Sequence, residues 1–187
     1  AASDVYKRQD EQEPLFHIER SLLRPLGLLL RTVQVNVYTV HQEQPRLWCA
    51  RRAAHKAIDP GLLDSLVAGG IGCDETPLST LFREASEEAG LAQTLARHAL
   101  PTGIMDSTSL SEDDGHTVLH RERMHVFDLQ VPEGFQPTHP DGETESASLQ
   151  SLEAVLAQIR QGQWTREGAW ASINLMHRHQ KGMLQLR

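Results

Sequence analysis

The stretch that decides the fold, residues 69–91, reads Gly-Gly-Ile-Gly-Cys-Asp-Glu-Thr-Pro-Leu-Ser-Thr-Leu-Phe-Arg-Glu-Ala-Ser-Glu-Glu-Ala-Gly-Leu. Thr76 offers the side-chain oxygen that an N-cap needs, and Pro77 fits the first helical position, where its missing N–H would have no partner. Gly90 can adopt the left-handed conformation that ends many helices. The stretch therefore predicts a helix over residues 77–89 that follows a glycine-rich loop.

The predicted helix has two chemically different faces. One face is apolar and would pack into a core; it carries Leu78, Leu81, Phe82, Ala85 and Ala89. Glu84, Glu87 and Glu88 share another face, where like charges within a turn repel by roughly 0.2–0.5 kcal/mol per pair. We therefore expect a cation beside them. One interpretation is a solvated acidic face with an Arg83–Glu87 pair, and the other is a metal site.

A longer pattern decides between these interpretations. The sequence fits Gly-x5-Glu-x7-Arg-Glu-U-x-Glu-Glu-x-Gly-U, where U is a bulky aliphatic residue, at Gly69, Glu75, Arg83, Glu84, Glu87, Glu88, Gly90 and Leu91. This pattern resembles the Nudix box. Ala85 is smaller than the aliphatic residue usual at the first U position, which affects packing rather than chemistry. Eight matches within 23 residues outweigh the interpretation of a solvated face.

The resemblance implies a fold and a cofactor. It implies an α/β Nudix fold, an α/β/α sandwich around a mixed β-sheet, with the catalytic helix at the edge of the sheet. It also implies that Glu84, Glu87 and Glu88 hold Mg²⁺, or alternatively Mn²⁺. Carboxylate oxygens suit these hard cations, which can bridge to substrate phosphates. Which carboxylate acts as the base varies within the family.

Further roles follow from the same resemblance. Arg83 and Glu75 correspond to the pair that connects the glycine loop to the helix. A glycine carbonyl, here that of Gly69, often supplies another metal oxygen, although a plain tight turn would also explain this residue. Glu143 or Glu145 could add a late metal ligand or a base.

A second resemblance is narrower. The chain is similar to the Nudix subfamily found beside thiamine pyrophosphokinase in some fungi, in residues 47–52, 56–64, 67–70, 135–137 and 141–143. Members of that subfamily are implied to convert oxo and oxy forms of thiamine diphosphate to monophosphates. Arg51, Arg52 and Lys56 could bind the substrate phosphate, or they could be solvated charges near a hairpin. Trp48 and Phe135 could stack on a ring, although core positions are commoner for them.

Composition limits the classes of partner. The net charge is −7, with 39% hydrophobic and 23% charged residues, which is ordinary for a globular domain. An acidic chain argues against nucleic acid as the main partner and favours a small-molecule diphosphate held through metal. No signal peptide or membrane segment is evident, and two cysteines without ligand spacing favour a reducing, cytoplasmic setting. The oligomeric state is left open.

The rest of the chain divides into recognisable segments. Residues 1–13 are expected to be a disordered tail, whose opening resembles translated sequencing-adapter sequence; residues 14–30 a remnant of an N-terminal domain; and residues 31–182 the Nudix domain. Alternation and apolar runs predict strands at residues 32–41, 47–51, 66–68, 124–131 (half-buried) and 144–149. Helices are predicted at residues 152–161 and 170–179, the latter anchored by Trp170, Ile173, Leu175 and Met176. Residues 102–115 and 132–143 are predicted to be loops.

Three other functions compete with a thiamine-type hydrolase. A nucleoside diphosphate-type pyrophosphatase would use the same box. An isopentenyl diphosphate isomerase-like enzyme would need an active-site cysteine in a context that Cys49 lacks. A non-catalytic binding module would typically have lost box carboxylates, and all are present. A zinc site is not favoured, because the pairs His116 with His120 and His177 with His179 lack Cys or carboxylate partners at zinc spacing.

Overall fold

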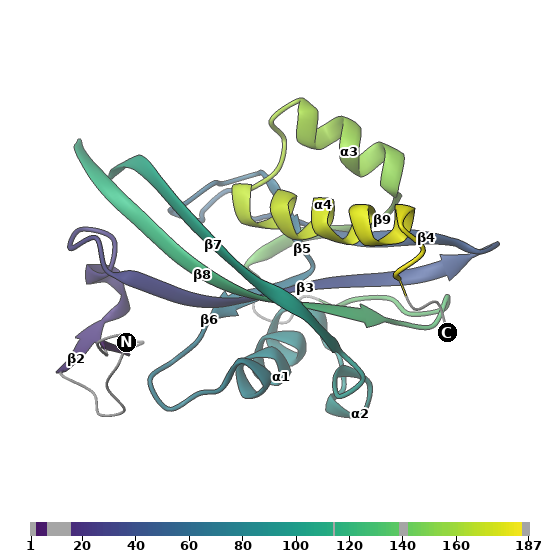
Figure 1. Ribbon diagram of the computed structural model, residues 1–187, viewed down its shortest axis with the longest axis horizontal. Helices are drawn as coiled ribbons and strands as arrows, with labels where there is room; N and C mark the ends of the chain where they lie inside the picture. Colours follow the sequence, from purple (N-terminus) through teal and green to yellow (C-terminus); the bar gives the residue numbers. More distant parts are fainter. Residues whose placement is uncertain (1–2, 7–15, 114, 139–141, 185–187) are drawn as a thin grey trace.

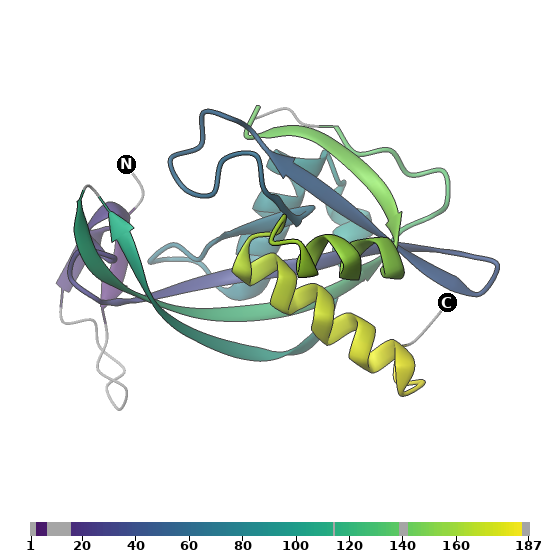
Figure 2. The same cartoon turned by 90° about the horizontal axis from the view of Figure 1, so that it is seen from above.

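The computed structural model describes residues 3–6, 16–113, 115–138 and 142–184. In these residues a mixed sheet lies between two pairs of helices, with α3 and α4 on one face and α1 and α2 on the other (Figure 1). The view from above shows α3 and α4 lying over the central strands (Figure 2). The helices are α1 (Pro77–Ala89), α2 (Gln93–Ala96), α3 (Leu152–Arg160) and α4 (Arg166–Gln180), with a 3-10 turn η1 at Arg20–Leu22. The α/β/α sandwich implied by the sequence is confirmed.

The strands of the described residues form two sheets. The small sheet pairs β1 (Ser3–Tyr6) with β2 (Phe16–Glu19). The main sheet contains β3 (Leu29–His41), β4 (Gln44–Arg52), β5 (Leu63–Ser65), β6 (Val67–Gly70), β7 (Leu100–Asp113), β8 (His116–Gln130) and β9 (Thr144–Ser151). No helix in this part of the chain combines the length and the apolar character needed to cross a bilayer.

The central strand β3 shapes the functional region. Along one side it runs parallel to β8. Along the other side its first half pairs with β6, where Thr32 lies opposite Gly70, and its last residues pair with β4, where Tyr38 lies opposite Leu47. Beyond Leu47, β4 leaves β3 and pairs with β5 instead, while its other edge pairs with β9 from Arg46 onward. The sheet is therefore split between β6 and the end of β4.

The two sides of the sheet have separate cores. Beneath α1, buried valines of β3 pack with Leu81, Ala85 and Ala89. Beneath α3 and α4, Tyr38 and Leu47 pack with Val155 and Leu175. Burial on both sides makes the prediction of a half-buried strand at residues 124–131 wrong: Met124, Val126 and Leu129 are all at most 1% exposed.

Most predicted elements are confirmed, and the helix at residues 77–89 matches α1 residue for residue. Thr76 accepts a hydrogen bond from the Ser79 backbone N–H, and Gly90 has φ +61°. Three predicted anchors are wrong, since Leu78, Trp170 and Ile173 are 45%, 42% and 44% exposed. The other two predicted anchors of α4, Leu175 and Met176, are buried, and Ala171 and Ser172 share their side of the helix.

Residues 102–115 are the largest correction. Most of the predicted loop is strand β7, paired with β8 from Leu100–Asp128 to Asp113–His116. Its Ser, Asp and Gly residues have weak strand propensity, but the long antiparallel ladder with the partner strand overrides this preference. Arg123 Nε and Nη2 also donate to the two oxygens of Asp106, each at 2.8 Å.

The N-terminal prediction also needs correction. Ser3–Tyr6 form β1, where the sequence predicts a disordered tail. The remainder of that tail, residues 1–2 and 7–13, lies outside the described residues.

The loop before α1 is fixed by one carboxylate. Glu75 accepts from Arg83 Nε at 2.7 Å and Nη2 at 3.0 Å, and also from the Gly72 backbone N–H and the Thr80 hydroxyl, both at 2.9 Å. These donors lie on the loop and on the first two turns of α1. The Glu75–Arg83 connection expected from the sequence is thereby present.

Replacing Glu75 tests how much this carboxylate stabilises the fold. The Arg83 hydrogen bonds lower the pKa of Glu75 from 4.5 to about 2. A lowered folded-state pKa contributes stability above about pH 4.5 that is lost as pH falls toward 2. We expect Glu75→Gln to lower the free energy of unfolding by about 1–2 kcal/mol at pH 7. The difference from wild type, measured by urea unfolding at pH 7, 5, 4 and 3, should shrink at acidic pH; a constant difference would contradict this role.

Candidate active site

The three box carboxylates project from α1 toward the split in the sheet. Arg83 Nη1 donates to Glu84 Oε1 at 2.8 Å and to Glu87 Oε2 at 3.0 Å. Glu88 Oε2 accepts from the backbone N–H of Ala68 at 2.7 Å, which fixes it against β6. In this structure the cation beside the acidic face is the guanidinium of Arg83. The Arg83–Glu87 ion pair considered in the sequence analysis is present.

The three carboxylates differ in environment. The Glu84 side chain is 11% exposed, whereas that of Glu87 is 52% exposed. Burial raises the pKa of Glu84, and the nearby charge of Arg83 opposes this rise. The site therefore offers one buried and one solvent-accessible carboxylate on the same helix.

Two glycines allow strand β6 to approach these groups. A Cβ at Gly69 would lie 1.9 Å from Glu84 Oε1, so only glycine leaves room for that carboxylate. The Gly70 carbonyl accepts from Arg20 Nη2 at 3.2 Å and from Arg83 Nη2 at 3.4 Å. The backbone here is held by two guanidinium groups.

A cavity of about 630 Å³ opens above the carboxylates. It is lined by Arg20, Arg52, Lys56, Ala68, Gly69, Gly70, Arg83, Glu84, Glu87, Glu88 and Glu143. We call it the catalytic cavity. It brings together most residues singled out in the sequence, with four acidic and four basic side chains in its wall.

Three of the predicted residues meet on the wall opposite α1. Lys56 Nζ and Glu143 Oε2 form a close ion pair. Arg52 Nη1 donates to Asp64 Oδ2 at 3.2 Å, while its Nε and Nη2 donate to the Ile58 carbonyl. The Glu143 carbonyl accepts from the Ala53 N–H at 2.9 Å, and the Thr138 N–H donates to the Ala89 carbonyl at the end of α1.

Several other candidates lie elsewhere. Arg51 does not line the cavity; its Nη1 donates to the Gly61 carbonyl at 2.7 Å. Glu145 is exposed and also outside the cavity lining. Trp48 and Phe135 contact each other edge to face, with ring centroids 6.0 Å apart, and belong to the core beneath α1.

Sequence reasoning missed Arg20. It lies in η1, within the segment interpreted as a remnant of another domain, yet it reaches the Gly70 carbonyl. A Cβ at Gly70 would lie 2.6 Å from Arg20 Nη1. Neither a motif nor a period connects residues 20 and 70, so no signal in the sequence points to this contact.

The donor set of the catalytic cavity suits a divalent cation. Glu84, Glu87 and Glu88 offer hard carboxylate oxygens on one helix, beside the backbone of β6, without sulfur or imidazole ligands. Such donors favour Mg²⁺ or Mn²⁺ over softer metals. Arg83 already neutralises part of this charge, so a bound cation would share the carboxylates with it.

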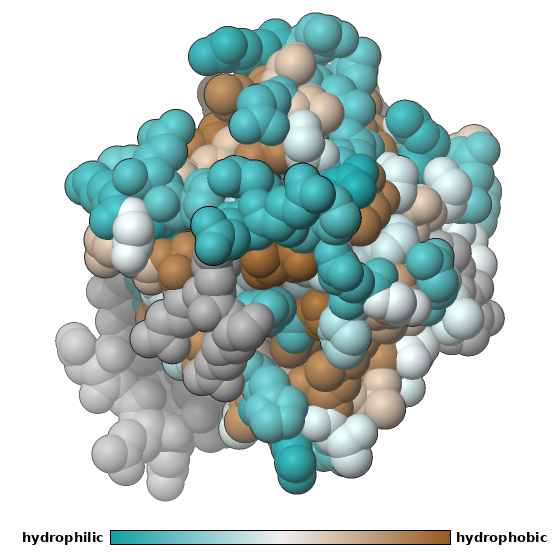
Figure 3. Space-filling view, turned by 90° about the vertical axis from the view of Figure 1, so that its right-hand side faces the viewer, coloured by the Kyte–Doolittle hydropathy of each residue, from teal (hydrophilic) through white to brown (hydrophobic). Residues whose placement is uncertain are grey.

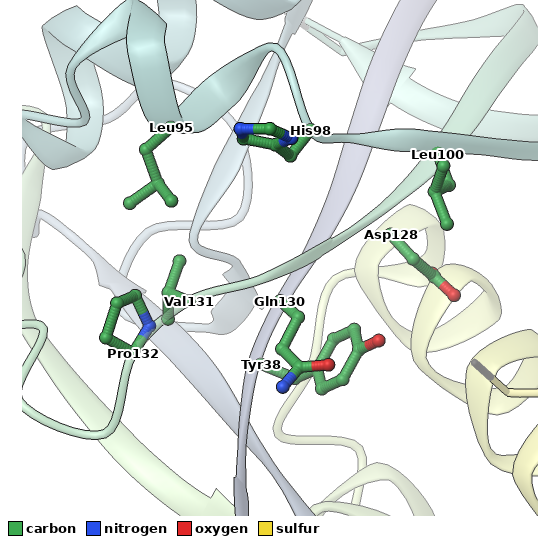
Figure 4. Close-up of a pocket in the computed structure, with 8 residues that line it drawn as sticks. All are labelled: Tyr38, Leu95, His98, Leu100, Asp128, Gln130, Val131 and Pro132. Atoms are coloured by element: carbon green, nitrogen blue, oxygen red, sulfur yellow. The ribbon is translucent and has the colours of Figure 1, made fainter. Parts of the chain in front are cut away.

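A separate cavity of about 350 Å³ lies between α2 and the end of β8. In Figure 4, Leu95 and His98 face Val131 and Pro132 across it, and Asp128 points toward α4. Asp128 is held there by Arg178 and by Asn36. No box residue lines this cavity, so its chemistry is unrelated to the box carboxylates.

The end of the molecule seen in Figure 3 exposes hydrophobic residues among hydrophilic ones.

Comparison with known proteins places this arrangement in a family. Residues 30–168 match the family described as "NUDIX domain". The chain is 30% identical over 165 residues to "Nudix hydrolase 24, chloroplastic" of Arabidopsis thaliana, covering 88% of this chain and 44% of the relative. It is 29% identical to "Nudix hydrolase 20, chloroplastic" of the same plant, covering 88% and 43%. The chain thus spans less than half the length of these relatives.

A solved structure shows the same fold. The crystal structure of DR0079 from Deinococcus radiodurans superposes with a TM-score of 0.61 at 21% identity, covering 94% of this chain and 98% of that one. The family match extends over most of the chain and includes the whole box, and the box carboxylates line one cavity. This chain belongs to the Nudix family.

Proposed function

We propose that this chain is a divalent-metal-dependent hydrolase of phosphoric anhydride bonds, and that it converts oxo or oxy forms of thiamine diphosphate to the monophosphate and phosphate. The observation that carries the hydrolase proposal is the catalytic cavity, in which the box carboxylates face Arg52, Lys56 and Arg20. The thiamine-type substrate is supported by the subfamily resemblance in residues 47–52, 56–64, 67–70, 135–137 and 141–143. The cytoplasmic location stays a prediction, since the plant relatives are named chloroplastic.

The reaction adds water across a P–O–P bond. The oxygen of water bonds to one phosphorus, the bridging oxygen leaves with the other phosphate, and the proton of water passes to a base. When bound, Mg²⁺ or Mn²⁺ neutralises phosphate charge and makes water a better nucleophile. Arg83 donates to both Glu84 and Glu87, and the Ala68 N–H donates to Glu88. The carboxylate of Glu87 is half exposed, so it can reach the cavity and accept the proton.

The basic side chains of the cavity are suited to binding the phosphate groups of the substrate. Arg52, Lys56 and Arg20 come from three separate segments and meet at the same cavity. Guanidinium and ammonium groups in such positions bind phosphate oxygens and stabilise the charge that grows on the leaving phosphate. Glu143, paired with Lys56, keeps that ammonium beside the cavity and is the acidic residue available as a further ligand.

The residues of the site argue against two of the three competing functions. An isomerase needs a reactive cysteine, but Cys49 is completely buried in the core beneath α3 and α4, and burial raises the pKa of its thiol. A binding module would not need the full set of box carboxylates lining the cavity. A nucleoside diphosphate-type pyrophosphatase uses the same chemistry, so substrate assays must separate it from the thiamine-type enzyme.

Replacing Glu87 tests the hydrolase proposal. We expect Glu87→Gln to lower kcat at least about 100-fold in Mg²⁺, because it removes a metal ligand or base while leaving an exposed side chain of the same shape. Phosphate release from a diphosphate panel and circular dichroism measure activity and folding. Glu133→Gln, on an exposed Glu that contacts His41, is the matched control. Full activity in Glu87→Gln would contradict the site assignment.

Gly69 tests the close approach of β6 to the carboxylates. Gly69→Ala places a methyl group 1.9 Å from the present position of Glu84 Oε1, so the carboxylate must move. Because misplacement by about 1 Å can cost on the order of 100-fold in rate, we expect a loss of 10- to 100-fold in kcat/KM. Gly134→Ala is the control, since a Cβ there meets nothing within 4 Å. Equal kinetics for both variants would show that Glu84 does not need this position.

A substrate panel tests the thiamine-type proposal. We expect oxythiamine diphosphate to exceed ADP-ribose and deoxynucleoside triphosphates in kcat/KM by at least about tenfold, the ratio that corresponds to roughly 1.4 kcal/mol of selective transition-state binding. Phosphate release and product mass at equal enzyme concentration measure it. A flat profile would retain the hydrolase and reject the thiamine-type substrate.

A further inference from the structure

A second cavity of about 220 Å³ adjoins the catalytic cavity. Both include Arg52 and the strand residues Ala68, Gly69 and Gly70 in their walls. Thr32 and Gln34, which lie opposite Gly70 and Ala68 in the β3–β6 pairing, also line the second cavity. A ligand whose phosphates occupy the catalytic cavity can therefore extend past β6 into the second one.

The second cavity is rich in hydrogen-bond acceptors. Its wall contains Asp59, Asp64, Glu122 and Glu167, against the two guanidinium groups of Arg24 and Arg52. Arg52 is already bonded to Asp64 and to the Ile58 carbonyl. The charge of this cavity suits a group that donates hydrogen bonds, whereas an anion would meet repulsion.

Two of these carboxylates are fixed at the base of α4. Glu122 is 5% exposed and accepts from the Thr32 hydroxyl at 2.7 Å, and its other oxygen lies 2.8 Å from His120 Nε2. Glu167 lies in the first turn of α4. Burial, and secondly the charge of Glu122, raise the pKa of Glu167. A hydrogen-bond donor placed between the two carboxylates would offset the repulsion that Glu122 exerts on Glu167.

Gln34 gives independent evidence for a ligand. Its side chain lines the second cavity and is 4% exposed, and its Oε1 finds no hydrogen-bond donor among the described residues. A buried carbonyl oxygen without a donor costs roughly 1–3 kcal/mol, which a ligand N–H could offset.

We propose that the second cavity binds the organic group of the diphosphate substrate and selects a heteroaromatic ring that presents N–H donors to Gln34 Oε1 and to the carboxylates of Glu122 and Glu167. This inference rests on the proposed hydrolase function. An apolar group placed here would leave Gln34 Oε1 buried and without a donor, which binding disfavours. The catalytic cavity then supplies the chemistry, and the second cavity supplies the selectivity.

A metal ion is the alternative occupant, since ligand atoms of His120, Glu122 and Glu167 lie within 4.8 Å of one another. Both oxygens of Glu122 are already engaged, one by Thr32 and the other by His120 Nε2. A metal would have to break the His120 contact or share its oxygen. An N–H donor can use a remaining lone pair of a Glu122 oxygen while both existing contacts stay in place, so these contacts favour the N–H donor.

The test compares substrates with and without such a ring. Oxythiamine diphosphate carries a pyrimidinone N–H, and methyl diphosphate carries no ring. We expect Glu167→Gln and Gln34→Met to lower kcat/KM for oxythiamine diphosphate about tenfold, mainly through KM, and to leave methyl diphosphate unchanged. Glu153→Gln on the exposed side of α3 is the matched control. Thermal unfolding establishes that each variant is folded.

The outcomes separate the two proposals. If wild type hydrolyses neither compound nor any other diphosphate, the proposed function fails. If wild type hydrolyses oxythiamine diphosphate and the variants keep its kcat/KM, or lose activity on methyl diphosphate to the same extent, the second cavity does not recognise the ring. If Glu167→Gln also lowers the number of Mn²⁺ ions bound, measured by calorimetry, while activity falls on both compounds, the cluster is a metal site and this inference is overturned.

Discussion

The guanidinium of Arg83 is the constraint on which the rest of the site depends. It binds Glu75 of the loop, Glu84 and Glu87 of the same helix, and the Gly70 carbonyl of β6. These bonds raise the pKa of Arg83, so the group stays charged at any pH at which the protein is folded. One planar group with five donors can join a loop, a helix and a strand at fixed angles, which an ammonium could not do. The spacing of Glu75, Arg83, Glu84 and Glu87 therefore has a geometric basis in this single group.

The split of the sheet leaves space for a cavity beside the Arg83 cluster. Because β6 and β4 pair with different ends of β3, the sheet opens where the carboxylates of α1 arrive. Cavities then form on both sides of β6, one with balanced charge and one rich in acceptors. Small residues at 68–70 keep that strand thin enough for both cavities to share it. A single split of the sheet thus accounts for two adjoining cavities of different charge.

The sequence predicts local features well and long-range ones poorly. The bounds of α1, its caps and the Glu75–Arg83 contact follow from spacing, because all of these interactions join residues at most eight positions apart. The same spacing cannot reveal Arg20 at the cavity, or Glu167 beside Glu122, since those pairs depend on how distant segments meet. The polar composition of residues 102–115 predicts a loop, but hydrogen bonding to β8 makes most of them strand β7. Exposed Trp170 and Ile173 show that apolar period alone does not fix which side of α4 faces inward.

Glu143 is held at the cavity wall through its backbone and through its side chain. Its carbonyl accepts from the Ala53 N–H, and its carboxylate pairs with Lys56. The Lys56 N–H in turn donates to the Ala53 carbonyl at 3.1 Å, so both contacts of Glu143 are made with one tight turn over residues 53–56. A displacement of this turn would therefore carry the ammonium and the carboxylate together, and the opposite charges would stay matched while the wall shifts.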